Sequence, residues 1–335
     1  MTSHERVISV LTVAAVLAMP PLAAGQAAAD RAAPTTAAPG TAAKAPPYTP
    51  RRTPDGQPDI TGLYIAFPLP GPIETSVLPP QQRQGGRAGG EFSFGINERP
   101  ALAGGAERRP LVVDPPDGKI PLQPGAHAKR AEIIARQERL EYLDGRVLCI
   151  APGIPRTQIP APVVGYQIFQ KPGYVVIFYE QSHLYRVIPL DGRGPLPPGI
   201  RKAMGVSRGR WEGNTLVVEV TSFTTNFPNN NWVIGSASVP AGVPPESLTS
   251  GHGIPHSDVY RVTERYTPID AETIRYEATI HDPKVYTQPW TISYDAMKKA
   301  PADYVPVEYA CHEGNERNLQ LMLGVDTTGV RVAVP

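Results

Sequence analysis

From about residue 165 onward, hydrophobic and polar positions alternate with a period of two. This is the period of a β-strand that buries one face and exposes the other. The pattern predicts strands at residues 166–170, 174–180, 183–189, 215–221, 258–266, 273–280, 290–294 and 305–311. The sequence Trp211-Glu212-Gly213-Asn214-Thr215 predicts a hairpin, because Gly213 and Asn214 tolerate the positive φ of a tight turn.

Short links between the strands predict the fold class. Residues 171–173, 181–182 and 270–272 leave room only for hairpin turns, so sequential strands should be antiparallel neighbours. We therefore predict a mainly β protein with an up-and-down, lipocalin-like antiparallel barrel, because closure removes the exposed edges of such a sheet. A two-sheet β-sandwich is the alternative.

The rest of the chain predicts a leader, a linker, one helix and one loop. Arg6 followed by the apolar run of residues 7–24 is typical of an export signal, so residues 1–27 are predicted to be a signal peptide. The alternative is a membrane anchor. Residues 28–57 are rich in Ala and Pro and predict a disordered linker. Residues 58–335 form a single barrel-like domain in this interpretation, with a flexible Gly-rich loop at 81–90 and a helix at 128–143.

Composition and cysteine count limit the compartment and the partners. The chain has 32 basic and 31 acidic residues, which argues against nucleic-acid binding through bulk charge. After residue 24 no apolar run reaches the length of a membrane span, so no stable span is expected after signal cleavage. Export leads to a periplasmic or secreted location, where the two cysteines, Cys149 and Cys311, are expected to form a disulfide.

One acidic residue lies on the apolar face of its predicted strand. Glu264 shares that face with Tyr260, Val262 and Tyr266. Either it is a structural carboxylate paired with an arginine, or it is an interior catalytic acid or base whose pKa burial would raise. We rank Arg186, Arg208 and Arg210 as its candidate partners, and the same arginines could instead clamp an anionic ligand group.

Other residues are candidates for a ligand-binding site. Tyr260 and Tyr276 could line an interior cavity or simply form core, and His183 lies at a strand end, near a predicted barrel mouth. No sequence pattern predicts a metal site or an organic cofactor. The first functional hypothesis is a protein that binds a small, partly apolar molecule inside the barrel. The second is a lyase, isomerase or hydrolase that uses Glu264 with an arginine partner.

Several segments resemble a family of exported bacterial proteins of uncharacterised function that is common in soil bacteria. They are PDITGLY (58–64), CIAPGIPR (149–156), GYQIFQKPGYVVIFYEQSHLYRVIPLDGR (165–193), SRGRWEGNTLVVEVTSF (207–223), ERYTPIDAETIRYEATIHDPKVYTQPW (264–290) and EYACHEGN (308–315). The hairpin at WEGNTLVVE also looks like a strand of lipocalin-like barrels. The resemblance implies export and a β-barrel but no activity. Members of that family usually carry His where this chain has Arg261, so no catalytic role is carried over to that position.

Overall fold

In a computed structural model, the structure describes residues 48–66, 110–136, 142, 149–159, 165–194, 196–197, 199–225, 253–306, 309 and 311. All of them belong to one compact unit, residues 47–335. The predicted signal peptide, residues 28–47 of the predicted linker and the loop at 81–90 lie outside the described residues. Within the described part of the chain, no helix is long and apolar enough to cross a membrane.

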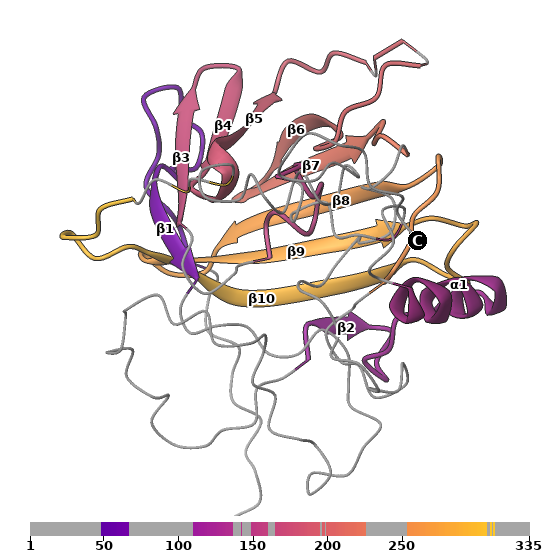
Figure 1. The fold of residues 1–335 in the computed structure, drawn as a ribbon. Helices are drawn as coiled ribbons and strands as arrows, with labels where there is room; N and C mark the ends of the chain where they lie inside the picture. Colours follow the sequence, from indigo (N-terminus) through magenta and orange to yellow (C-terminus); the bar gives the residue numbers. More distant parts are fainter. Residues whose placement is uncertain are drawn as a thin grey trace, which may run out of the picture. The chain divides into compact units, whose positions relative to one another are not determined.

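The described strands form one antiparallel sheet that is nearly closed into a barrel (Figure 1). They run in the order β5-β4-β3-β1-β10-β9-β8-β7-β6, and β2 pairs with β10 outside this path. Their bounds are β1 Gly62–Ala66, β2 Val112–Asp114, β3 Gly165–Lys171, β4 Tyr174–Tyr179, β5 Leu184–Pro189, β6 Val206–Glu212, β7 Thr215–Thr221, β8 Arg261–Pro268, β9 Thr273–His281 and β10 Trp290–Lys299. The predicted barrel-like fold is therefore confirmed.

The sheet consists of two arms of sequential hairpins, joined by a strand from much earlier in the chain. Strands β3 to β5 form one arm and β6 to β10 the other, as the short links predict. Strand β1 lies between them, with Tyr64 opposite Tyr166 on β3 and opposite Lys299 on β10. Read around the barrel from β1, the strands therefore follow the chain in up-and-down order from β3 to β10 and return to β1, and β2 alone among the described strands lies off this path.

The seam of the barrel lies between β5 and β6, which face each other without ladder hydrogen bonds. A Cβ atom built on Gly209 would lie 2.6 Å from Leu190 Cδ2 and 2.7 Å from Ile188 Cγ2. The close approach of the two edges thus depends on the missing side chain of Gly209. Side chains also bridge the seam, because Arg186 of β5 donates hydrogen bonds to Ser207 Oγ of β6.

The inward faces of the strands form a packed core. Tyr166, Ile177, Val218, Tyr276 and Trp290 are each at most 1% exposed. They belong to one continuous hydrophobic cluster that draws on both arms and on β1. Period-two burial, such as the strictly alternating pattern of β8, confirms the face assignments made from the sequence. The described interior is consequently filled by side chains from every part of the sheet.

One helix, α1 (Pro124–Ala135), lies outside the sheet (Figure 1). It begins four residues earlier than predicted because proline, which lacks an N–H, fits the first turn of a helix. Ile133 and Ile134 are buried against Gly253, where an added Cβ would lie 3.2 Å from Ile134 Cγ1. Of the remaining predicted helical residues, Arg136 caps the helix end, Tyr142 lies outside α1, and 137–141 and 143 lie outside the described residues.

Two further sequence predictions need correction. The predicted strand at 305–311 is wrong, because Val305, Pro306, Tyr309 and Cys311 are not in a strand. Pro306 cannot donate a ladder hydrogen bond, which works against a strand there. Regular structure also begins before the predicted boundary at residue 58, since Arg52 pairs with Pro58 in a bridge and donates a hydrogen bond of 2.9 Å to Asn214 Oδ1.

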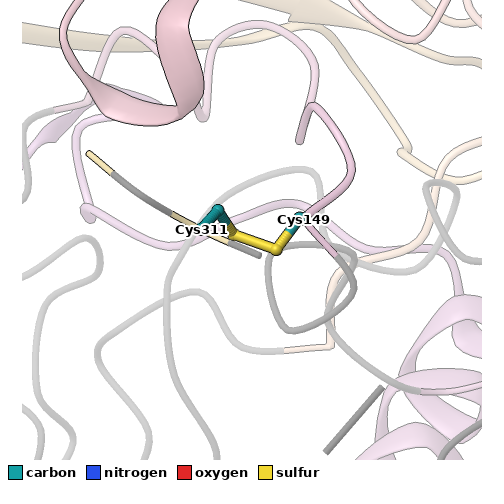
Figure 2. Close-up of a disulfide and its surroundings, with 2 residues drawn as sticks. All are labelled: Cys149 and Cys311. Atoms are coloured by element: carbon teal, nitrogen blue, oxygen red, sulfur yellow. A yellow bond between two sulfur atoms is a disulfide. The ribbon is translucent and has the colours of Figure 1, made fainter. Parts of the chain in front are cut away.

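A disulfide fastens the C-terminal strap, which we define as residues 300–306 with Tyr309 and Cys311. Figure 2 shows the bond between Cys149 and Cys311, whose Cα atoms are 5.8 Å apart, so the predicted pairing is confirmed. The strap contacts the connection between β4 and β5. Its Tyr304 hydroxyl donates to Glu180 Oε2 at 2.7 Å, and its Tyr309 N–H donates to His183 Nε2 at 3.2 Å.

Removal of the disulfide should destabilise the protein and loosen the strap. We expect the double variant Cys149→Ala/Cys311→Ala to lose about 2–4 kcal/mol in free energy of unfolding, the usual effect of a native disulfide that closes a long loop. Urea unfolding measures the loss, and limited proteolysis locates it in the strap. Dithiothreitol should reproduce the loss in the wild type and leave the variant unchanged. A wild type whose unfolding does not respond to the reductant would contradict this expectation.

Candidate functional site

The carboxylate singled out from the sequence lies inside the barrel and is paired with an arginine. Glu264 on β8 accepts hydrogen bonds from Arg186 on β5, at 3.1 Å from Nη1 to Oε1 and 2.5 Å from Nη2 to Oε2. The two side chains are 0% and 2% exposed. Two parallel N–H···O bonds give this ion pair the bidentate geometry that arginine and carboxylates favour. The predicted burial of Glu264 and its pairing with Arg186 are both confirmed.

Two tyrosines of the core also donate hydrogen bonds to Glu264. The hydroxyls of Tyr266 and Tyr276 each lie 2.9 Å from Oε1. Burial raises the pKa of both hydroxyls well above the ordinary tyrosine value, so both keep the proton that they donate. Burial lowers the pKa of Arg186, but its interactions with Glu264, Tyr179 and Tyr266 together raise that pKa well above the ordinary arginine value, and the guanidinium stays charged. Four hydrogen bonds therefore compensate the buried carboxylate.

The loop before β3 completes this network from within the barrel. Gln158, which is fully buried, accepts hydrogen bonds at Oε1 from the hydroxyls of Tyr179 and Tyr266, both at 3.1 Å. Its backbone oxygen accepts from Tyr166 at 2.9 Å and from Tyr294 at 2.6 Å. Burial raises the pKa of Tyr179 to about 12. One residue thus ties tyrosines from four strands together.

This environment is that of a structural ion pair. A catalytic acid or base must come within hydrogen-bond reach of its substrate. Glu264 is fully buried, and Arg186, Tyr266 and Tyr276 contact it directly. A substrate could reach the carboxylate only after displacement of these partners.

The other two candidate arginines lie on the opposite face of the sheet. Arg208 on β6 donates to the backbone oxygens of Gly194 and Ser207. Arg210 donates to Glu212 Oε1 at 2.7 Å on the exposed surface. Their neighbour Ser207 points to the inner face instead, where its hydroxyl accepts a hydrogen bond from Arg186. Neither Arg208 nor Arg210 contacts Glu264.

The remaining predicted ligand-binding residues are spread over separate places. Tyr276 belongs to the Glu264 network, whereas the Tyr260 hydroxyl donates to the backbone oxygen of Ile154 at 2.9 Å, and its ring stacks on His256. His183 is exposed and contacts the strap through Tyr309. Among the described residues, no group of three or more His, Cys, Asp or Glu side chains could hold a metal ion.

A hollow of about 410 Å³ lies on the outer face of the first arm and β1. We call it the outer hollow. Most of its lining is apolar or aromatic and comes from neighbouring strands: Leu63, Phe169, Val176, Phe178 and Tyr185. Pro306 of the strap lines it from the other side. Its volume falls in the range of small-molecule sites, roughly 300–1,000 Å³.

Strand register brings these side chains together. Leu63 lies opposite Gln167, Gln167 opposite Phe178, and Phe178 opposite Tyr185, so one row of side chains crosses β1, β3, β4 and β5. Side chains directly opposite each other on one face of a sheet are in contact distance. Tyr185 is 69% exposed. Apart from Gln167, the row is therefore an apolar and aromatic surface, and it is open to solvent at Tyr185.

The floor of the outer hollow combines a glycine with a carboxylate. Gly165 N–H donates to Glu180 Oε2 at 2.6 Å, and Glu180 is 2% exposed. A Cβ atom on Gly165 would lie 3.2 Å from that oxygen and 3.4 Å from Leu63 Cδ1. The missing side chain thus allows Glu180 and Leu63 to pack closely against the backbone at Gly165. Sequence reasoning missed this site, although outward-facing Phe169, Phe178 and Tyr185 were a signal, because such positions usually carry polar side chains.

Comparisons with protein-family models, curated proteins and solved structures give no match to this chain. Its class therefore follows from the fold and site alone. It is a nearly closed antiparallel β-barrel, with a packed, hydrogen-bonded interior and an apolar hollow on its outer face.

Proposed function

We propose that this protein is an exported binding protein that holds a small, partly apolar molecule in the outer hollow. The observation that carries the proposal is the apolar and aromatic lining of the hollow by four neighbouring strands and the strap. Exposed apolar patches that are contiguous commonly mark binding sites. The filled interior supports the outer face as the position of the ligand.

An exported location is part of the proposal. The disulfide between Cys149 and Cys311 supports it, because such bonds persist in oxidising compartments. The apolar run of residues 7–24, read as a signal peptide, supports the same location, periplasmic or secreted. Acid–base catalysis at Glu264, the second hypothesis, has no supporting observation in the fully buried ion pair.

Binding of a neutral aromatic probe tests the proposal. In an NMR titration, 2-phenylethanol should shift the amide signals of Gln167, Phe178 and Tyr185. Loss of the Tyr185 ring in Tyr185→Ala should weaken binding about fivefold, the scale of one aromatic contact. Tyr174→Ala is the matched control, because Tyr174 on β4 is exposed, as Tyr185 on β5 is, but does not line the hollow. Equal affinities of the two variants, or shifts that map elsewhere, would contradict the site.

The natural ligand can be sought directly. Mass spectrometry of small molecules that remain on protein purified from its native source should find a compound that is depleted in the Tyr185→Ala variant and retained in Tyr174→Ala.

A further inference from the structure

One polar side chain interrupts the apolar row of the outer hollow. Gln167 of β3 lies directly opposite Leu63 of β1 on one side and Phe178 of β4 on the other. It lines the hollow and is partly exposed. Because side chains that lie opposite each other on one face of a sheet are close neighbours, a molecule that packs on Leu63 and Phe178 also covers Gln167.

The carboxamide of Gln167 makes no hydrogen bond with any residue in the described part of the chain. The second glutamine of β3 shows the contrast. Gln170 accepts a hydrogen bond of 2.6 Å from the Ile60 N–H and donates one of 3.0 Å to the backbone oxygen of Pro58. The donor and the acceptor of Gln170 are therefore used by the fold, whereas those of Gln167 remain for a ligand.

The other polar side chains of the lining do not offer a ligand the same group. Glu180 is 2% exposed, and its Oε2 atom already accepts hydrogen bonds from the N–H of Gly165 and the hydroxyl of Tyr304. Tyr185 is 69% exposed, so its hydroxyl can stay in water when its ring contacts a ligand. Gln167 is thus the polar group of the described lining that a bound molecule has to match.

The cost of covering Gln167 selects among ligands. An amide that loses its water without gaining another partner weakens binding. A site with such a group discriminates against molecules that are alike in shape but lack the complementary donor or acceptor. A purely apolar molecule therefore gains contact with Leu63 and Phe178 but loses affinity at Gln167.

We infer that the ligand of the outer hollow carries an amide-type edge, with a hydrogen-bond acceptor next to an N–H donor, on an apolar body. The side-chain amide of Gln167 has an oxygen acceptor beside an NH₂ donor, so such an edge can pair with both at once. Carboxamides and lactams have this edge. The inference rests on the proposed function and adds the polar group of the ligand to it.

Two uncharged probes of the same shape test the inference. In 3-phenylpropanamide an NH₂ group stands where 4-phenylbutan-2-one has a methyl group, and the phenyl body and the carbonyl are the same. Burial alone favours the more apolar ketone. We expect the amide instead to bind roughly tenfold more tightly than the ketone, because only the amide satisfies both the donor and the acceptor of Gln167. Isothermal titration calorimetry on the full mature chain gives both affinities.

The variant Gln167→Met removes the carboxamide and keeps a side chain of similar length. It should reverse the preference, so that the ketone binds more tightly than the amide. Gln57→Met is the matched control, since Gln57 is also partly exposed but does not line the hollow, and it should keep the wild-type preference. The affinity ratio in the wild type tests the inference even if Gln167→Met does not fold.

The outcomes separate the inference from the proposed function. If the ketone binds in the hollow at least as tightly as the amide, or if folded Gln167→Met still prefers the amide, the amide-type edge is wrong and the proposed function stands. If neither probe binds, both are overturned.

Discussion

Glu264→Gln should lower the free energy of unfolding by about 3–5 kcal/mol, the usual effect of removing one partner of a buried ion pair. The change leaves the Arg186 guanidinium, whose side chain is 2% exposed, without its counter-charge. It also replaces the carboxylate that accepts hydrogen bonds from the Tyr266 and Tyr276 hydroxyls by a neutral amide. Urea unfolding followed by circular dichroism measures the loss.

A surface glutamate with two arginine partners provides the matched control. Glu212 contacts Arg210 at 2.7 Å and Arg265 at 3.0 Å, but its side chain is 40% exposed. Exposed ion pairs contribute less than about 1 kcal/mol, so Glu212→Gln should unfold almost as the wild type does. Equal losses in the two variants would contradict a special role for burial. An unchanged stability of Glu264→Gln with a loss of probe binding would instead assign Glu264 to function.

Replacement of both charges separates the cost of an unpaired charge from the value of the pair. The double variant Arg186→Met/Glu264→Met should recover much of the stability lost in Glu264→Gln, because neither charge is then buried alone. Recovery should be incomplete, since the hydroxyls of Tyr266 and Tyr276 lose their acceptor at Glu264. A double variant that is less stable than the single variant would contradict this account.

High pH should unfold the protein in a narrow range above pH 10. Burial raises the pKa of seven tyrosines in the folded chain: Tyr64, Tyr179, Tyr260, Tyr266, Tyr276, Tyr286 and Tyr294. In the unfolded chain a tyrosine loses its proton near pH 10. The folded state therefore binds more protons than the unfolded state above that pH, and its stability falls as pH rises.

The expected effect is large because the contributions of the seven tyrosines add. Each contributes about 1.4 kcal/mol per pH unit above pH 10, which gives a total of roughly 10 kcal/mol near pH 11. This is the size of the whole free energy of unfolding of an ordinary domain. Below pH 10 the same tyrosines are protonated in both states and contribute no pH dependence.

Alkaline titration measures this effect. The ultraviolet absorbance of tyrosinate from the buried tyrosines and the loss of the β-sheet circular dichroism signal should change together in one cooperative step. Tyr286→Phe removes one of the seven groups, whose hydroxyl donates a 3.3 Å hydrogen bond to the backbone oxygen of Pro255. The slope of unfolding free energy against pH should therefore fall by about one seventh. Complete tyrosine ionisation in a sheet that stays folded would contradict the prediction.

The sequence predicted the parts of the fold that depend on local pattern. Period-two alternation located most of the strands and placed Glu264 on the inner face. It failed at β6, where Ser207-Arg208-Gly209-Arg210 has no alternating apolar residues to mark the inner side. The inner residues proved to be Ser207 and Gly209, which bridge or approach the seam, and both arginines lie on the other face.

Contacts between distant segments were not predictable from local pattern. No strand was predicted at residues 62–66, so the pairing of β1 with β3 and β10 was not predicted either, because pairing partners depend on tertiary arrangement. Gln158 resembles any loop glutamine in the sequence, yet it contacts tyrosines from several strands. The outer hollow likewise requires the register of four strands and the course of the strap.

The position of β1 has a consequence for the order in which the chain folds. During synthesis, Tyr64 emerges long before Tyr166 and longer still before Lys299, the two residues that it lies between in the sheet. Each arm can form from neighbouring hairpins, which is fast, whereas contacts of large sequence separation form slowly. Until β1 is inserted, β3 and β10 each retain an open edge that can pair with another chain. The nascent protein is therefore most exposed to aggregation after its hairpins have formed, and the strand that ends this exposure is the one made first.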